Sequence, residues 1–176
     1  MTNSATTFLL LAGLQMTSVT GIAGIVEGRI TLAAPRSLAD RPVIFLSGGG
    51  LSGAAPRHVV VEERNGRLTP EFVVLSVGSS LSLGAEHQAV KFEKPGVVQV
   101  YSRHQPGMSV TVLVTPNHWF AVADRDGAFV LPYTPQGTYD VIVWHKATGF
   151  LKQTIEVAAA GIVDASLEIP VQDAPH

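Results

Sequence analysis

The sequence predicts an all-β protein, built as one antiparallel β-sandwich or as two small stacked sandwiches, behind an apolar N-terminal segment. Three observations carry this prediction. Short apolar or alternating runs of about strand length recur along the whole chain. Turn-forming residues stand between these runs, with 17 Gly and 11 Pro among the 176 residues. No segment repeats its apolar residues with the helical period of about 3.6.

The composition argues against several classes of function. The net charge is -2, from 12 Lys and Arg residues and 14 Asp and Glu residues. The chain therefore lacks the excess of positive charge that attracts nucleic acid. The chain has no cysteine, so disulfides, thiolate metal sites and cysteine nucleophiles are all excluded. A chain of this length can bury a sufficient core without such cross-links.

The N-terminal segment, residues 1–24, differs from the rest of the chain. No charged side chain precedes Glu27, and residues 8–14 form a compact apolar run. The segment is a signal peptide cleaved after Ala23, a retained membrane anchor, or a plain N-terminal arm. A signal peptide usually has Lys or Arg before its apolar run, and this segment has neither. Polar residues follow the run, so the segment would make a poor membrane span. All three readings are commoner in exported proteins, so we expect a periplasmic, membrane-associated location.

The first strands are predicted from local patterns of apolar and polar side chains. Residues 25–32 alternate apolar and polar side chains, and residues 42–47 form an apolar run rich in branched residues. The run 58–63 is a third strand, and Asn65-Gly66 after it is a strong signal for a tight hairpin turn. Residues 72–77 alternate again.

The later strands lie between turns rich in Gly, Pro and Asp. A Lys-Pro-Gly turn precedes the run 96–101, and Asp124 to Gly127 and Pro135 to Gly137 separate further runs. The remaining predicted strands span residues 109–114, 119–123, 128–131, 139–144, 153–157 and 165–169.

Two glycine-containing turns each allow a structural and a functional interpretation. Gly48 to Gly53 lacks the Gly-Lys-Ser/Thr ending of a phosphate-binding loop and has no helix pattern behind it, which favours a plain loop. Asp124-Arg125-Asp126-Gly127 could start a calcium loop, but the remaining ligands, including the glutamate at the twelfth position, are missing. The favoured interpretation of the second turn is a tight hairpin.

Three longer stretches resemble known families. FAVADRDGAFVLPYTPQGTYDVIVWH, residues 120–145, resembles the carboxypeptidase regulatory-like, transthyretin-type β-sandwich. Two earlier stretches resemble the cupredoxin-like domain of methylamine-utilisation-type periplasmic proteins. They are FVVLSVGSSLSL (residues 72–83) and KFEKPGVVQVYSRHQPGM (residues 91–108). The resemblance implies a cupredoxin-like or immunoglobulin-like antiparallel sandwich. It also implies a domain over residues 25–115, regulatory-like strands over 116–170 and a tail over 171–176.

In that family the second stretch carries Cys-x-x-His-x-x-Met, which with an earlier histidine forms a type 1 copper site. Here the thiolate position falls on Ser102, the imidazole position on Gln105 and the thioether position on Met108. A hydroxyl cannot supply the copper–thiolate bond of such a site. His104 is shifted by one residue, which would turn it to the other face, and His87 lies in a loop too short for the family's first histidine. The resemblance therefore implies a copper site that has been dismantled, and we expect no metal and no cofactor.

Other chemistry finds little support in the residues. Five of the six histidines are dispersed singles (His58, His87, His104, His118 and His145), although three of them could still converge on zinc or copper in the fold. The chain has no Gly-x-Ser-x-Gly nucleophile motif. The Glu62-Glu63 pair lies beside a hairpin turn, where a solvated face explains it. We expect no catalytic residues, no enzyme activity and no small-molecule substrate.

The remaining candidate function is contact with a partner protein through exposed side chains. Trp119, Phe120, Tyr133 and Trp144 lie near predicted strand ends, where most of them are expected to pack in the core and the exposed ones to anchor a partner. The sequence favours a non-catalytic accessory subunit on the periplasmic side of a membrane-bound electron-transfer complex, respiratory or photosynthetic. The electron-transfer part rests on analogy with the copper proteins. The alternative is a soluble periplasmic copper-binding or electron-transfer protein with an unconventional site at Met108 and nearby histidines.

Overall fold

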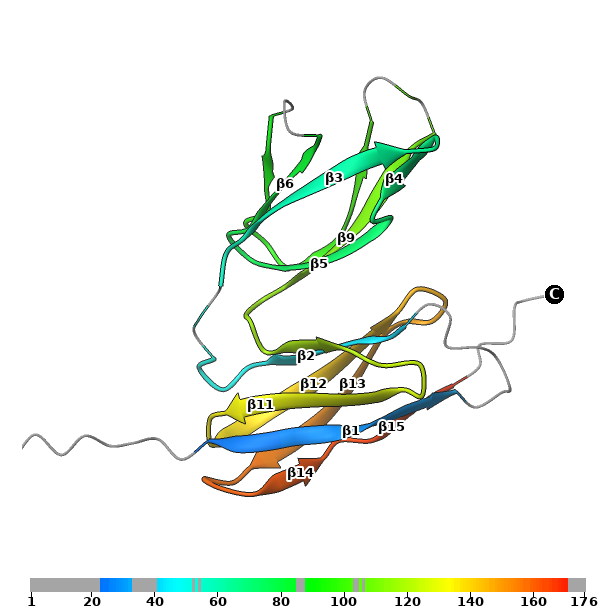
Figure 1. Ribbon diagram of the computed structural model, residues 1–176. Helices are drawn as coiled ribbons and strands as arrows, with labels where there is room; N and C mark the ends of the chain where they lie inside the picture. The colour runs from blue at the N-terminus through cyan, green and yellow to red at the C-terminus, as the bar shows by residue number, and fades with distance from the viewer. Residues whose placement is uncertain are drawn as a thin grey trace, which may run out of the picture.

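A computed structural model describes residues 23–32, 41–51, 53, 55–84, 88–102, 105 and 107–170. These residues form strands, turns and loops but no helix, which confirms the predicted all-β class (Figure 1). The strands are β1 (Gly24–Leu32), β2 (Val43–Ser47), β3 (His58–Arg64), β4 (Arg67–Thr69), β5 (Phe72–Ser76), β6 (Ser80–Leu83), β7 (Val90–Lys91), β8 (Gly96–Tyr101), β9 (Ser109–Thr115), β10 (Phe120–Val122), β11 (Ala128–Thr134), β12 (Gly137–His145), β13 (Gly149–Val157), β14 (Ile162–Asp164) and β15 (Leu167–Ile169).

The described strands form two β-sandwiches. The terminal sandwich contains β1, β2 and β10–β15: one sheet has the order β11-β1-β14, with β15 also paired to β1, and the other has the order β10-β2-β12-β13. Its core includes Val26 and Ile30 from the first sheet and Ile44 and Val141 from the second, all fully buried. The inserted sandwich contains β3–β9, with sheets in the orders β4-β3-β6-β7 and β5-β9-β8 around a second core.

The two sandwiches share a third apolar layer. Val43 and Phe45 of β2 and Trp144 of β12 pack there against Val74 of β5 and Leu113 of β9. Alternation explains this arrangement, because Ile44 and Leu46 face the terminal core while their neighbours on β2 face the inserted sandwich. Strands buried on both faces read as continuous apolar runs, and β2, β5 and β9 have such sequences: VIFLS, FVVLS and SVTVLVT.

The pairing shows how the chain is divided between the sandwiches. β2 pairs with β10 and β12, and β1 pairs with β11, β14 and β15. Strands from the range 25–115 therefore lie beside strands from the range 116–170, and β3–β9 form an insertion between β2 and β10. The pairings β1–β14, β1–β15, β3–β6 and β5–β9 are parallel, so three of the four sheets are mixed and depart from the predicted antiparallel arrangement. The sheet β10-β2-β12-β13 is purely antiparallel.

The predicted strands and the structure agree at most positions. The range 96–101 coincides with β8, and Asn65 and Gly66 have the positive φ values, 53° and 75°, that a two-residue hairpin turn requires. The short strands β4, β6, β7 and β14 were not predicted. In the part of the chain that the structure describes, no helix is long and apolar enough to cross a membrane. The predicted N-terminal segment up to residue 22 and the tail lie outside the described residues.

Candidate functional site

Ser102, Gln105 and Met108, which stand at the copper-ligand positions and are called the copper-loop residues below, lie together in the connection from β8 to β9. The backbone N–H of Gln105 donates to Ser102 Oγ at 3.3 Å, and the N–H of Ser102 donates to the Met108 carbonyl at 3.0 Å. The side-chain amide of Gln105 donates to Glu63 Oε1 on β3 at 2.9 Å. Met108 packs against the core of the inserted sandwich. The structure thus joins Ser102, Gln105 and Met108 in a single hydrogen-bonded loop.

The histidines have separate surroundings. His58 contacts Ser80 Oγ through Nδ1 at 2.9 Å and Ser82 Oγ through Nε2 at 3.3 Å, and no carboxylate among the described residues is hydrogen-bonded to its ring. His118 stacks on Trp119 and hydrogen-bonds to the Gly53 carbonyl. His145 is buried and accepts the N–H of Ala147 at 3.3 Å. Within the described ranges, no three His, Cys, Asp or Glu side chains are close enough to share a metal ion. His87 and His104 lie outside those ranges.

The Asp124 segment is a hydrogen-bonded turn between β10 and β11. Asp124 Oδ1 accepts the N–H groups of Asp126 at 2.9 Å and of Ala128 at 2.8 Å. The N–H of Gly127 donates to the Asp124 carbonyl at 3.2 Å, and Gly127 has a φ of 79°. These bonds are those of an Asx turn, which uses the carboxylate to satisfy backbone donors.

The glycine-rich loop after β2 has a packing role. Gly49 has a φ of 61°, and a Cβ added to it would collide with the ring of Tyr139 and lie 2.9 Å from the Thr138 carbonyl oxygen. Gly137 approaches the same ring, where a Cβ would lie 2.8 Å from the tyrosine hydroxyl. The close approach to Tyr139 therefore explains these glycines without a bound phosphate.

The four aromatic candidates divide between core and surface. Trp144 is 8% exposed and stacks on Phe72, with ring centroids 5.1 Å apart, and Phe120 packs in the same layer between the sandwiches. Trp119 packs partly against the terminal core, and its indole N–H donates to the Tyr133 carbonyl at 3.2 Å. Tyr133 is 80% exposed. It is thus the aromatic candidate that the structure presents to solvent.

Tyr133 lies at an irregularity in the pairing of β1 with β11. The register shifts between Gly24 and Val26, and Tyr133 has a φ of 55°. This conformation is strained for a bulky residue. Strain of this kind concentrates at functional positions, although it also accompanies a β-bulge that only redirects a strand.

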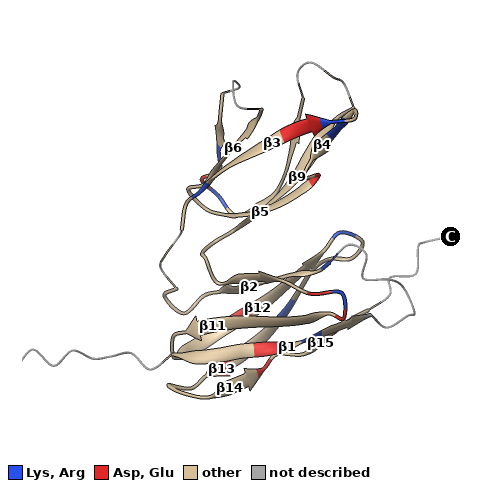
Figure 2. Ribbon diagram, viewed as in Figure 1, with Lys and Arg blue, Asp and Glu red and all other residues tan. Residues whose placement is uncertain are grey.

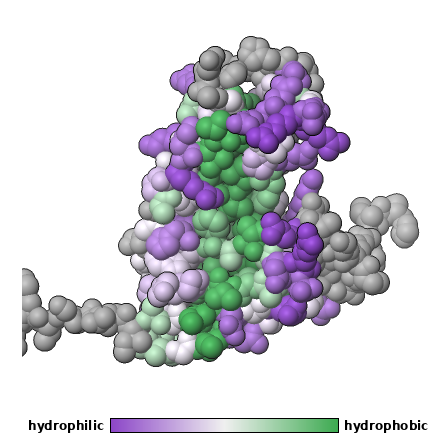
Figure 3. All heavy atoms as spheres, in the orientation of Figure 1, coloured by the Kyte–Doolittle hydropathy of each residue, from purple (hydrophilic) through white to green (hydrophobic). Residues whose placement is uncertain are grey.

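Exposed apolar side chains gather on the outer face of the same sheet. Val26 is fully buried, so its neighbours Ile25 and Glu27 point outward. Ile162 is paired with Ile25, and Val130 is paired with Glu27. Ile25, Val130 and Ile162 are 37%, 51% and 63% exposed. We call Ile25, Val130, Ile162 and the neighbouring Tyr133 the outer apolar face. Figure 3 shows a band of hydrophobic side chains down the middle of the face in view.

Sequence reasoning included Tyr133 but missed the three aliphatic members of this face. The alternation in residues 25–32 already places Ile25 opposite the core residues. The pairing of Ile25 with Ile162, which are 137 positions apart in the sequence, has no local signal. No protein-family model matches the chain, and no curated protein matches it.

Proposed function

We propose that the protein is a non-catalytic accessory subunit on the periplasmic side of a membrane-bound electron-transfer complex, and that it acts through protein–protein contacts. The observation that carries the contact role is the outer apolar face. Single exposed apolar residues are ordinary on protein surfaces, whereas neighbouring ones on one face mark interaction sites. Exposed tyrosine and branched aliphatic side chains are common at interfaces, and Glu27, which is paired with Val130 on the same face, would lie at the rim of the contact.

The position of this face supports contact with a membrane complex. Ile25 belongs to β1, which follows directly on a segment without a charged residue. Whatever holds that segment would also bring the outer apolar face close to it. The partners are then subunits of a membrane-protein complex, with the N-terminal segment near or in the membrane. The electron-transfer assignment is supported by the resemblance of residues 72–83 and 91–108 to cupredoxin-like periplasmic proteins.

Purification from native membranes tests the proposal. Tagged full-length protein is extracted in mild detergent and the co-purifying subunits are identified. The double variant Val130→Lys/Ile162→Lys should lose those subunits, because two charges would have to be buried in the contact. The matched control Val97→Lys/Val98→Lys changes two exposed valines on β8 of the inserted sandwich and should retain them.

Deletion of residues 1–23 gives a second measurement. The shortened chain should remain folded and move to the soluble fraction, or bind its complex more weakly. The proposal is wrong if the full-length protein is free and monomeric in the soluble periplasm and its loss depletes no membrane complex. Equal loss of subunits in both double variants would show that the contact is not made by the outer apolar face.

A further inference from the structure

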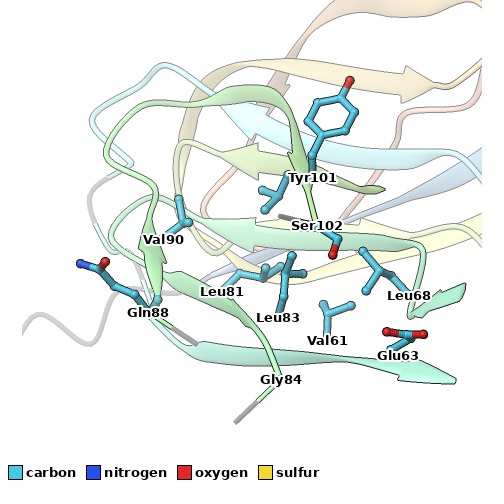
Figure 4. Close-up of a pocket in the computed structure, with 12 residues that line it drawn as sticks. Val61, Glu63, Leu68, Leu81, Leu83, Gly84, Gln88, Val90, Tyr101 and Ser102 are labelled. Atoms are coloured by element: carbon cyan, nitrogen blue, oxygen red, sulfur yellow. The ribbon is translucent and has the colours of Figure 1, made fainter. Parts of the chain in front are cut away.

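The inserted sandwich has a pocket of about 450 Å³ at one end, between its two sheets. Aliphatic side chains from both sheets line it: Val61, Leu68, Leu81 and Leu83 on one side and Val100 on the other, with Val90 at the edge. Figure 4 shows the side chains of Val61, Leu68, Leu81, Leu83 and Val90 around the opening, with the Tyr101 ring directed away from it. The volume is in the usual range for small-molecule sites.

A carboxylate lies at the edge of this apolar pocket. Val59 and Val61 of β3 pack into the core, and Glu63 continues the same face two residues further on. Glu63 is paired with Leu68, which is buried in the same core. Figure 4 shows the Glu63 carboxylate close to Val61 and Leu68, and Figure 2 shows the acidic stretch of β3 in red, just before the basic end of the strand. Glu63 therefore faces the pocket.

The partners of the two adjacent glutamates differ. Glu62 points away from the core face and pairs with Arg64, whose Nη2 lies 2.8 Å from Glu62 Oε2. Glu63 accepts a hydrogen bond from the neutral amide of Gln105, and none of the ion pairs among the described residues includes it. Glu63 is exposed at the edge of the aliphatic walls, and no described residue forms an ion pair with it. A carboxylate in this position is complementary to a ligand that carries one positive charge.

We propose that this pocket binds a small amphipathic organic amine. The aliphatic body of the ligand lies between the two sheets, against Val61, Leu83 and Val100. Its protonated amino group donates to the Glu63 carboxylate, while Gln105 holds the other side of that carboxylate. This binding site is independent of the outer apolar face, which lies on the terminal sandwich.

Calorimetric titration of the full-length protein with chains of equal length and different head groups tests the proposal. At pH 7 an alkylamine is protonated, as a lysine side chain is. We expect n-octylamine to bind at least about tenfold more tightly than n-octanoate, with n-octanol between them. We expect n-hexylamine to bind about fifteenfold more weakly than n-octylamine, because it lacks two methylenes and each buried methylene contributes about fourfold in affinity.

Substitutions of the two adjacent glutamates distinguish binding in the pocket from binding to the outer surface of β3. Glu63→Gln should remove the preference for the amine, and Glu62→Gln, on the opposite face of the same strand, should leave it unchanged. Leu83→Trp should fill the pocket and weaken the binding of all of these ligands. Val90→Trp, at the more tolerant edge, serves the same purpose if Leu83→Trp does not fold.

Three results would overturn the proposal. The first is the absence of octylamine binding up to about 1 mM, which corresponds to no more than a weak contact. The second is equal affinity for the amine and the carboxylate. The third is a preference for the amine that survives Glu63→Gln.

Discussion

At the scale of a single residue, the packing around Tyr139 changes the pKa of its hydroxyl group. Its ring is enclosed by Gly49 and Gly137, and its hydroxyl donates to the Gln136 carbonyl at 3.3 Å. Burial raises the pKa of Tyr139 above its ordinary value of 10.0, because the charged phenolate is poorly solvated there. The stability that this residue contributes is complete below the unfolded-state pKa and is lost as the pH rises through the folded-state pKa.

We therefore predict that Tyr139→Phe will flatten the loss of stability at high pH. The free energy of unfolding of the wild-type protein, measured by urea denaturation, should fall more steeply between pH 9 and 11 than that of the variant. Tyr133→Phe is the matched control, because it removes the same hydroxyl from an exposed position. Parallel pH curves for the wild type and Tyr139→Phe would contradict the assignment.

The copper-loop residues give a second prediction at this scale. Ser102 supplies a hydroxyl and Gln105 an amide where a blue-copper site needs a thiolate and an imidazole. Protein incubated with Cu(II) should therefore develop no intense absorption band near ~600 nm, where copper–thiolate charge transfer absorbs. A blue protein with stoichiometric copper would reverse this interpretation and favour the electron-transfer alternative.

At the scale of elements, the turn between β10 and β11 depends on one backbone conformation. Gly127 has a φ of 79° and closes the turn in which Asp124 Oδ1 accepts two backbone N–H groups. Gly127→Val should lower the free energy of unfolding by about 1 kcal/mol or more, because a β-branched residue is strained at positive φ. Gly127→Asn should cost less, since asparagine tolerates this conformation.

Calcium provides an independent test of the same turn. If the Asp124 carboxylate serves only the turn, added calcium should leave the melting temperature unchanged, because a ligand that binds only the folded state must raise it. Calcium-dependent stabilisation together with a harmless Gly127→Val would identify an ion site instead.

For the whole molecule, the apolar layer between the sandwiches determines how strongly they are coupled. Trp144 stacks on Phe72 across this layer and is nearly buried. Trp144→Ala should cost about 3–5 kcal/mol, as truncation of a large buried aromatic usually does. Its partner across β12 and β13, Phe150, is 52% exposed, so Phe150→Ala should cost much less. Urea denaturation measures both, and equal losses would show that Trp144 has no special role in the layer.

The sequence by itself determined the class of the fold and most of its strands. Alternation and branched apolar runs are local properties, so ranges such as 96–101 coincide with strands of the structure. The turns at Asn65-Gly66 and Asp124 to Gly127 were predictable for the same reason, because their backbone conformation depends on adjacent residues. Strands as short as β4, β7 and β14 contain too few residues to show a period.

Tertiary structure alone decided which strands pair and which faces are covered. Trp144 and Tyr133 were equivalent candidates in the sequence, yet one is buried between the sandwiches and the other faces solvent. The outer apolar face joins Ile25 to Ile162, and the pocket at Glu63 forms where the two sheets of the inserted sandwich leave an apolar space. The physical reason is that burial depends on contacts between distant segments. A strand's own alternation shows which side chains share a face, and only the neighbouring sheets decide whether that face is core, interface or open to solvent.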